Sequence, residues 1–155
     1  MNALITVGQV LGSKGYDYWS IAADSTAYEA LELMANKNVG ALLVMEGEHI
    51  IGIFSERDYA RKVILKGKAS RTTSVLDIMS SPPICIEPGK SLNECMVVMR
   101  KNHIRHLPVM DHGQLLGIVS INDIIDAMIA AQETTIRDLE DYITGDACIP
   151  KSVSR

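Results

Sequence analysis

The chain has 155 residues, of which 47% are hydrophobic and 22% charged, a balance typical of a globular protein with a sizeable core. The net charge of -4 argues against nucleic-acid binding, because neutralising phosphates needs a cluster of Lys and Arg that this sequence lacks. No run approaches the roughly 18 apolar residues that cross a bilayer, and no basic segment followed by an apolar stretch opens the chain. We therefore expect a cytoplasmic protein that binds neither nucleic acid nor membrane.

The cysteines and histidines do not form a metal-binding pattern. Cys85, Cys95 and Cys148 are odd in number and show no CxxC spacing, which predicts reduced thiols rather than disulfides or a zinc site. His103 and His106 are three residues apart, but a predicted break between a helix and a strand places them on different elements. We expect no metal ion.

The chain repeats itself at a constant offset of 65 positions. The stretch Gly52 to Asp58 returns as Gly117 to Asp123, and the register holds without a gap from Val10 and Val75 onward. Other matching pairs are Ile21/Ile86, Glu29/Glu94, Met34/Met99, Leu42/Leu107, Val44/Val109 and Met45/Met110. The repeat predicts a first unit over residues 7–66, a polar linker over 67–74 and a second unit over 75–131.

Each unit is expected to read β-α-β-β-α after a short helical lead-in. Thr26-x-x-Glu29 is a capping box, which predicts a helix start, and the unalternating apolar run 41–45 is typical of a strand covered on both faces. The first unit is predicted to have strands at 19–22, 41–45 and 50–54 and helices from Thr26 and from Ser55 to about Lys66. The second is predicted to have a lead-in at 75–79, a strand at 84–86, a helix from 91 to 102, a hairpin over 106–119 and a helix from Ser120.

The sheet of each unit has only one face for its own two helices, so each unit needs the other to cover its remaining apolar surface. The predicted fold class is therefore α+β, with the two tandem repeats packed as one pseudo-twofold module. Residues 132–155 are expected to form a C-terminal helix and tail: apolar residues at 136, 139 and 143 predict a helix ended by Gly145, and 146–155 a frayed end. This helix could pack on a second subunit or fold back on its own module.

Both copies place Ser-x-x-Asp at a predicted junction between a strand and a helix, at Ser55 to Asp58 and at Ser120 to Asp123. An Asp in the first helical turn can accept two hydrogen bonds from a ribose diol, and the neighbouring helix amides suit an anion. The same spacing nearly matches a capping box, which needs no ligand. The residues alone leave both interpretations open.

The two copies resemble CBS domains, named for cystathionine β-synthase, which pair in tandem as a Bateman module. The resemblance covers roughly residues 7 to 130. It is carried by the doubled Gly-h-h-Ser-x-x-Asp motif, where h is an apolar residue, and by the run Ile104-Arg105-His106-Leu107-Pro108-Val109. It implies a stand-alone regulatory pair that binds AMP, ADP, ATP, NAD or S-adenosylmethionine, with AMP, ATP or NAD favoured, in clefts between the copies.

The resemblance also implies a role for individual residues. Asp58 and Asp123 would hold ribose hydroxyls, and Ser55 and Ser120 would lie beside the ribose and phosphate. Contacts to the base would come mainly from backbone groups at Ile21, Ala22, Ile84, Cys85, Ile86 and Pro108. Because both copies keep the motif, neither cleft is ruled out.

Cations next to the second hairpin break the symmetry of the repeat. Arg105 and His106 stand where the first copy has Gly40 and Ala41. Arg105 could bind a phosphate through two hydrogen bonds with His106 adding a third, or it could face solvent beside a partly buried His106. Arg57 and Arg61, four apart on one helix face, are further phosphate candidates, although plain surface charge is the favoured explanation for them.

The motifs bear differently on three classes of function. A regulatory module that senses an adenine nucleotide and acts on an unknown partner fits the motifs. A structural dimerisation protein with degenerate sites is the alternative, since capping alone would retain every motif residue. An enzyme is not expected, because the serines lack a paired His and Asp in the local pattern. The flat, apolar module also predicts a homodimer, either head-to-head or head-to-tail.

Overall fold

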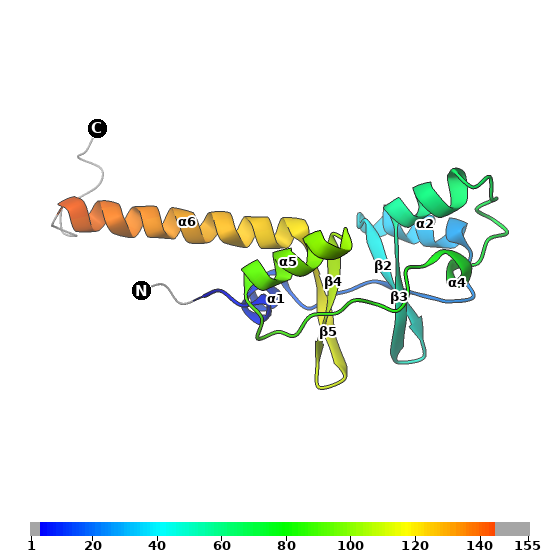
Figure 1. Cartoon of the computed structure of the whole chain (residues 1–155), viewed down its shortest axis with the longest axis horizontal. Helices are drawn as coiled ribbons and strands as arrows, with labels where there is room; N and C mark the ends of the chain where they lie inside the picture. Colours follow the sequence, from blue (N-terminus) through cyan, green and yellow to red (C-terminus); the bar gives the residue numbers. More distant parts are fainter. Residues whose placement is uncertain (1–3, 145–155) are drawn as a thin grey trace.

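The computed structural model describes residues 4–144, which form two halves side by side and a long last helix that projects beyond them (Figure 1). In chain order the elements are α1 (Val7–Lys14), β1 (Ser20–Ala22), α2 (Ala27–Lys37), β2 (Ala41–Glu46), β3 (His49–Ser55), α3 (Glu56–Tyr59), η1 (Ala60–Ile64), α4 (Val75–Ile78), α5 (Leu92–Asn102), β4 (His106–Asp111), β5 (Gln114–Ser120) and α6 (Ile121–Thr144). The predicted α+β class and both hairpins are confirmed.

The two sheets differ by one strand. In the first copy β1 pairs in parallel with β2, which pairs antiparallel with β3. In the second copy β4 and β5 form the same hairpin, but the predicted strand at 84–86 is reduced to a single bridge between Ile86 and Val109. The cause is Pro108. It stands where the first copy has Leu43, whose N–H donates to Trp19 O, and proline has no N–H to donate.

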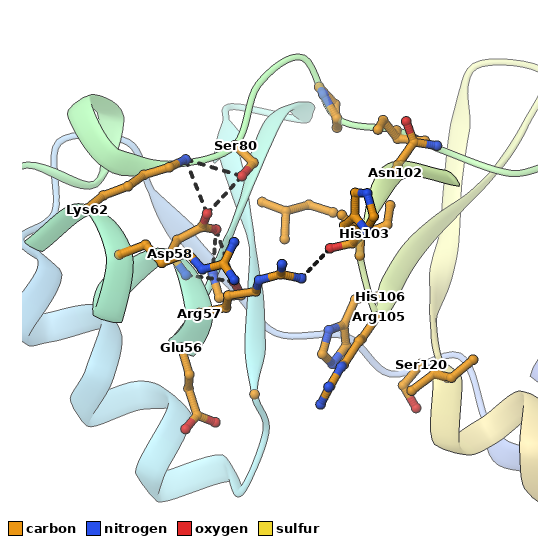
Figure 2. Close-up of a pocket in the computed structure, with 18 of the residues that line it drawn as sticks. Glu56, Arg57, Asp58, Lys62, Ser80, Asn102, His103, Arg105, His106 and Ser120 are labelled. Atoms are coloured by element: carbon orange, nitrogen blue, oxygen red, sulfur yellow. Dashed lines mark hydrogen bonds and ion pairs between the residues drawn. The ribbon is translucent and has the colours of Figure 1, made fainter. Parts of the chain in front are cut away.

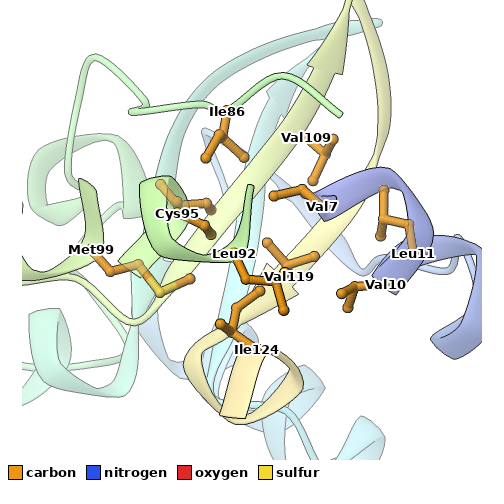
Figure 3. Packing of buried hydrophobic residues seen from close by; sticks show 11 residues of the cluster. Val7, Val10, Leu11, Ile86, Leu92, Cys95, Met99, Val109, Val119 and Ile124 are labelled. Carbon is orange, nitrogen blue, oxygen red and sulfur yellow. The ribbon is translucent and has the colours of Figure 1, made fainter. Parts of the chain in front are cut away.

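The short lead-in helices are exchanged between the two cores. Val7, Val10 and Leu11 of α1 are buried among residues of the second copy, including Ile124 (Figure 3). Conversely, α4 opens the second copy but buries Val75 and Ile78 in the core of the first copy. Each hydrophobic core is therefore completed by the segment that opens the other copy, and the two cores do not follow the repeat boundaries in the sequence.

Two helices are present where they were predicted but differ from the prediction in type or extent. The helix expected from Ser55 to about Lys66 is α-helical only to Tyr59 and continues as the π-helix η1, in which the N–H of Leu65 donates to Ala60 O. The separate helix expected near Thr134 is instead the second half of α6, which runs unbroken because residues 130–133 contain no Gly or Pro. The predicted stop at Gly145, the tail and Cys148 lie outside the described residues.

The motif glycine of the first copy has a packing role. A Cβ at Gly52 would lie 2.7 Å from Met79 Sδ and 2.8 Å from Ser80 O, because the segment after α4 crosses directly over β3. This close approach requires a residue without a side chain.

Gly52→Ala should therefore lower the free energy of unfolding by about 1–3 kcal/mol through overpacking. Urea titration followed by circular dichroism measures the change. The matched control is Gly89→Ala, where a Cβ meets nothing within 4 Å, so stability should hold or rise slightly. Equal midpoints for the two variants would contradict this account of Gly52.

Candidate functional site: the cleft at Asp58

Each motif aspartate lies in the first turn of a helix, α3 or α6, and takes part in the cap of that helix. Asp58 Oδ2 accepts from the N–H of Ser55 at 3.0 Å, and Ser55 Oγ accepts from the N–H of Asp58 at 3.1 Å. Asp123 and Ser120 repeat this exchange at 2.8 and 3.1 Å. The capping interpretation is thus confirmed as a structural role in each copy. It uses only one carboxylate oxygen of Asp58, and it does not exclude a ligand.

The other oxygen of Asp58 faces donors from two segments (Figure 2). Asp58 Oδ1 accepts from Ser80 Oγ at 2.9 Å and lies 3.2 Å from Lys62 Nζ. The Asp58 side chain is 13% exposed and that of Lys62 41% exposed, so the carboxylate is fixed while the ammonium reaches water. A carboxylate held in this way can accept hydrogen bonds from a ligand that replaces the lysine.

Asp58 lines a cleft of about 800 Å³ that lies between the two copies. The first copy contributes Ser55 and residues of α3 and η1, and the second contributes the end of α5, the start of β4 and Ser120 (Figure 2). The cationic and titratable basic residues in its wall are Arg57, Arg61, Lys62, His103, Arg105 and His106, and the acidic residues are Glu56 and Asp58. The excess of basic groups favours an anionic ligand.

Arg57 connects the two copies across this cleft. Its guanidinium donates to His103 O at 2.5 Å (Figure 2). His103 ends α5 in the left-handed conformation, with φ of 55°, which leaves carbonyl groups of the last turn available. Arg57 is thus more than a plain surface charge, whereas Arg61 is an exposed residue of the cleft wall.

His106 is a partly buried neutral donor or acceptor rather than a second cation. Burial lowers the pKa of His106; the charge of Asp123 raises it in part, and Lys14 and Arg105 lower it further. Neutral imidazole can still give one hydrogen bond to a phosphate oxygen. Arg105 is exposed at the cleft wall, where its fixed charge can face an anion.

The predicted base-contact residues are scattered. Ile84 lines the cleft, next to Pro82 and Pro83. The other five are not among the lining residues: Ile21 and Ala22 lie in β1, Ile86 and Pro108 pair with each other through an N–H to O bond, and Cys85 precedes them. The structure therefore gathers the predicted ribose and phosphate residues of the first junction but, of the base-contact set, only Ile84.

Sequence reasoning missed Lys62, Ser80 and Lys14. Lys62 follows Asp58 by four residues, a helical spacing that would have identified the pair. Ser80 lies 22 residues from Asp58, and Lys14 lies 109 residues from its partner Asp123. No local pattern reports such distant contacts.

Asp123 differs from Asp58 in its surroundings. Its carboxylate does not line the cleft, although Ser120 and Asn122 do. Asp123 Oδ2 accepts from Lys14 Nζ at 2.7 Å. Burial raises the pKa of Asp123, but the hydrogen bonds from Lys14 and from the Ser120 N–H outweigh burial, so the pKa lies below its ordinary value.

Comparison with known proteins decides the family. The sequence model of the CBS domain matches residues 10–65 and again 75–130. The chain belongs to the CBS domain family. The two matches coincide with the two copies of the repeat, so it contains a tandem CBS pair. Stand-alone CBS domain proteins typically have regulatory or signalling roles rather than enzymatic ones.

Relatives share both sequence and shape with this CBS pair. The mitochondrial CBS domain-containing protein CBSX3 of Arabidopsis thaliana is 36% identical over 150 residues, which are 90% of this chain and 72% of that protein. A solved CBS-domain structure from Burkholderia ambifaria is 43% identical with a TM-score of 0.79, covering 82% of this chain and 96% of that one. The hexameric CBS-CP12 protein of bloom-forming cyanobacteria is 26% identical, with a TM-score of 0.70, and covers 79% and 70% of the two chains.

In residues 4–144 no helix has the length and apolarity to span a membrane. Since one relative is mitochondrial, the cytoplasmic location stays a prediction.

The lowered pKa of His106 predicts a pH dependence of stability. In the unfolded chain His106 has the ordinary pKa of 6.5, whereas in the folded protein its pKa is lower. The contribution of neutral His106 to the free energy of unfolding is therefore fully present above pH 6.5 and is lost as the pH falls through the lower pKa of the folded protein. The lowered pKa of Asp123 acts only below 3.8 and does not overlap this window.

His106→Gln should thus reduce the loss of unfolding free energy between about pH 7.5 and about pH 5.5, measured by urea titration. His112→Gln is the control, because the His112 side chain is 94% exposed. The same pH dependence in the wild type and in both variants would show that His106 does not carry the effect.

Proposed function

We propose that this CBS pair is a regulatory module that binds one adenine nucleotide, such as AMP, ADP, ATP or NAD, or S-adenosylmethionine, in the cleft at Asp58. The observation that carries the proposal is the Asp58 carboxylate in the wall of a cleft whose basic groups come from both copies. A ribose diol needs an acceptor of this kind, and phosphates need the cations. A volume of about 800 Å³ lies within the range of small-ligand sites.

The ligand would enter by displacing Lys62. A ribose hydroxyl takes the place of its ammonium at Asp58 Oδ1, while the capping bond from Ser55 N–H to Oδ2 is kept. The released Lys62 then adds its charge to those of Arg61 and Arg105 beside the phosphates. Ile84, 36% exposed, provides an apolar contact for the base.

Binding in this cleft would act on the relative position of the two copies, because its wall is shared between them. A ligand shifts an equilibrium only if it has different affinities for the two states. Contacts with both copies provide such a difference, and an unidentified protein would respond to it. We propose no catalysis, since Ser55 Oγ bonds to Asp58 rather than to a histidine base.

Asp58→Ala tests ribose binding against capping. The variant should lose about 1 kcal/mol of stability as a cap and should also lose the stabilisation by ligand. In the unmutated protein that stabilisation is about 2.7 kcal/mol at a hundred times the dissociation constant. The measurement is thermal unfolding with AMP, ADP, ATP, NAD and S-adenosylmethionine in turn.

Glu94→Ala is the matched control, because Glu94 also accepts from its cap residue, the N–H of Ser91, yet lies outside the cleft. It should lose the cap and keep the ligand effect. If none of the five compounds raises the melting temperature of the unmutated protein, the nucleotide proposal fails. If Asp58→Ala retains the shift, the ligand binds elsewhere.

A dimerisation or scaffold role is the second candidate, and α6 favours it. Apolar residues on its exposed side follow the alternating spacing of four and three residues that is typical of a coiled coil. The a positions are Ile129, Ile136 and Ile143, and the d positions are Ile125, Leu139 and, as the one polar member, Gln132. The five apolar members are 40% to 80% exposed, which indicates a face without a partner in the monomer.

The charges beside this face favour its pairing with the same face of α6 from a second copy, with the two helices parallel. All three e positions are acidic, namely Asp126, Glu133 and Glu140, whereas the g positions Met128, Thr135 and Tyr142 are neutral at pH 7. Antiparallel helices would place acidic e residues opposite one another. Parallel helices place each e residue opposite a neutral g residue, and Ile at a also favours two strands. A homodimer through α6 therefore accompanies the proposed nucleotide site.

Light scattering during gel filtration should give a mass near twice 17.0 kDa for the unmutated chain. Ile136→Lys should yield monomers, because it buries a charge in the seam between the two helices. Thr134→Lys adds the same charge on the outer f position of α6 and should stay dimeric. A dimer that persists in Ile136→Lys would place the interface on another surface.

A further inference from the structure

The two motif aspartates meet different chemical groups at equivalent places. In the first copy Ser80 donates two hydrogen bonds: its N–H donates to Ile53 O at 2.8 Å, and its Oγ donates to Asp58 Oδ1 at 2.9 Å. In the second copy the equivalent acceptors are Ile118 O and Asp123. Ile118 O and Asp123 Oδ2 both accept from one group, Lys14 Nζ, each at 2.7 Å, and this Oδ2 is also the oxygen that accepts the cap bond from the Ser120 N–H. A charged amine thus replaces a backbone N–H and a hydroxyl.

The backbone that carries Lys14 is packed firmly against the second copy. It is the last residue of α1, whose Val10 and Leu11 are buried in the core of the second copy. The chain after it packs so closely on β5 that a Cβ at Gly117 would lie 3.2 Å from Leu11 Cδ2 and 3.3 Å from Tyr16 O. This packing keeps the backbone of Lys14 next to β5, so its ammonium stays within reach of Asp123 and Ile118 O.

The ion pair at Asp123 is shorter than the one at Asp58 and its lysine is less exposed, although the Asp58 carboxylate, at 13%, is the more buried of the two aspartates. Lys14 and Asp123 are 29% and 22% exposed and 2.7 Å apart, whereas Lys62 is 41% exposed and 3.2 Å from Asp58. A charge-assisted bond of this length is roughly twice as strong as a bond between neutral groups. A neutral ribose hydroxyl can replace Lys62 at little cost but would lose in competition with Lys14.

We propose that Lys14 closes the Asp123 junction to nucleotides, so that the module binds one nucleotide per chain, at Asp58. Lys14 is a specificity-determining residue, because its ammonium holds the Asp123 carboxylate that a ribose would need in the second copy. This inference rests on the proposed nucleotide function. The aspartate motif alone predicts two equivalent sites, and one lysine from the exchanged lead-in helix distinguishes them.

Calorimetric titration with AMP counts the sites. The unmutated chain should bind one AMP and Lys14→Met, which keeps the apolar stem but lacks the charge, should bind two. Lys14→Met combined with Asp58→Ala should bind one, at the Asp123 junction. Lys66→Met, an exposed lysine outside the cleft, should behave as the unmutated chain. Circular dichroism checks that each variant is folded.

Each outcome decides the inference. One site in both the unmutated chain and folded Lys14→Met would overturn the role of Lys14 and leave the proposed function intact; two sites in the unmutated chain would also overturn that role. If no variant binds AMP, the same titrations with ADP, ATP, NAD and S-adenosylmethionine follow, and no binding of any of the five would overturn the function and the inference together. Binding only by Lys14→Met would reject the Asp58 site but support the closure by Lys14. Should Lys14→Met not fold, Asp58→Ala alone still tests the closure, because AMP binding to it with Lys14 present would contradict it.

Discussion

The exchange of lead-in segments between the two hydrophobic cores is the interaction on which the module depends. Burying α1 in the second core and α4 in the first ties the copies together, so neither core is complete without the other half of the chain. Units of about sixty residues bury little surface alone, and the exchange offsets this weakness. It also determines what each aspartate meets, since the segments that cross the strands carry Ser80 and Lys14.

Capping and ligand binding are compatible because they use different atoms of the same side chain. The cap fixes Asp58 Oδ2 against the first turn of α3 and thereby orients Oδ1 toward Ser80 and Lys62. A carboxylate that is already positioned loses little entropy when a ligand binds. The two interpretations of Ser-x-x-Asp are therefore compatible, because in the proposed site the cap would position the acceptor.

The sequence predicted what depends on local spacing. The repeat, hairpins and capping boxes follow from residues within a few positions of one another, and the offset of 65 located Asp58 and Asp123 at matching junctions. It could not predict which core α1 joins, because an apolar face specifies burial but not a partner. The missing strand pairing in the second copy could have been foreseen, since Pro108 at the position of Leu43 removes a donor. Lys14 could not, because its partner is 109 residues away.

Arg57 suggests how occupancy of the cleft would reach the rest of the protein. Its bond to His103 O links α3 of the first copy to the end of α5 in the second across the site of the proposed ligand. A phosphate in the cleft would compete with this carbonyl for the guanidinium, and the carbonyl carries only a partial charge, so the phosphate would win. The direct link between the copies would then be exchanged for one through the nucleotide. Because α5 packs against α6, a shift of the second copy would be passed to the helix that carries the proposed dimer interface.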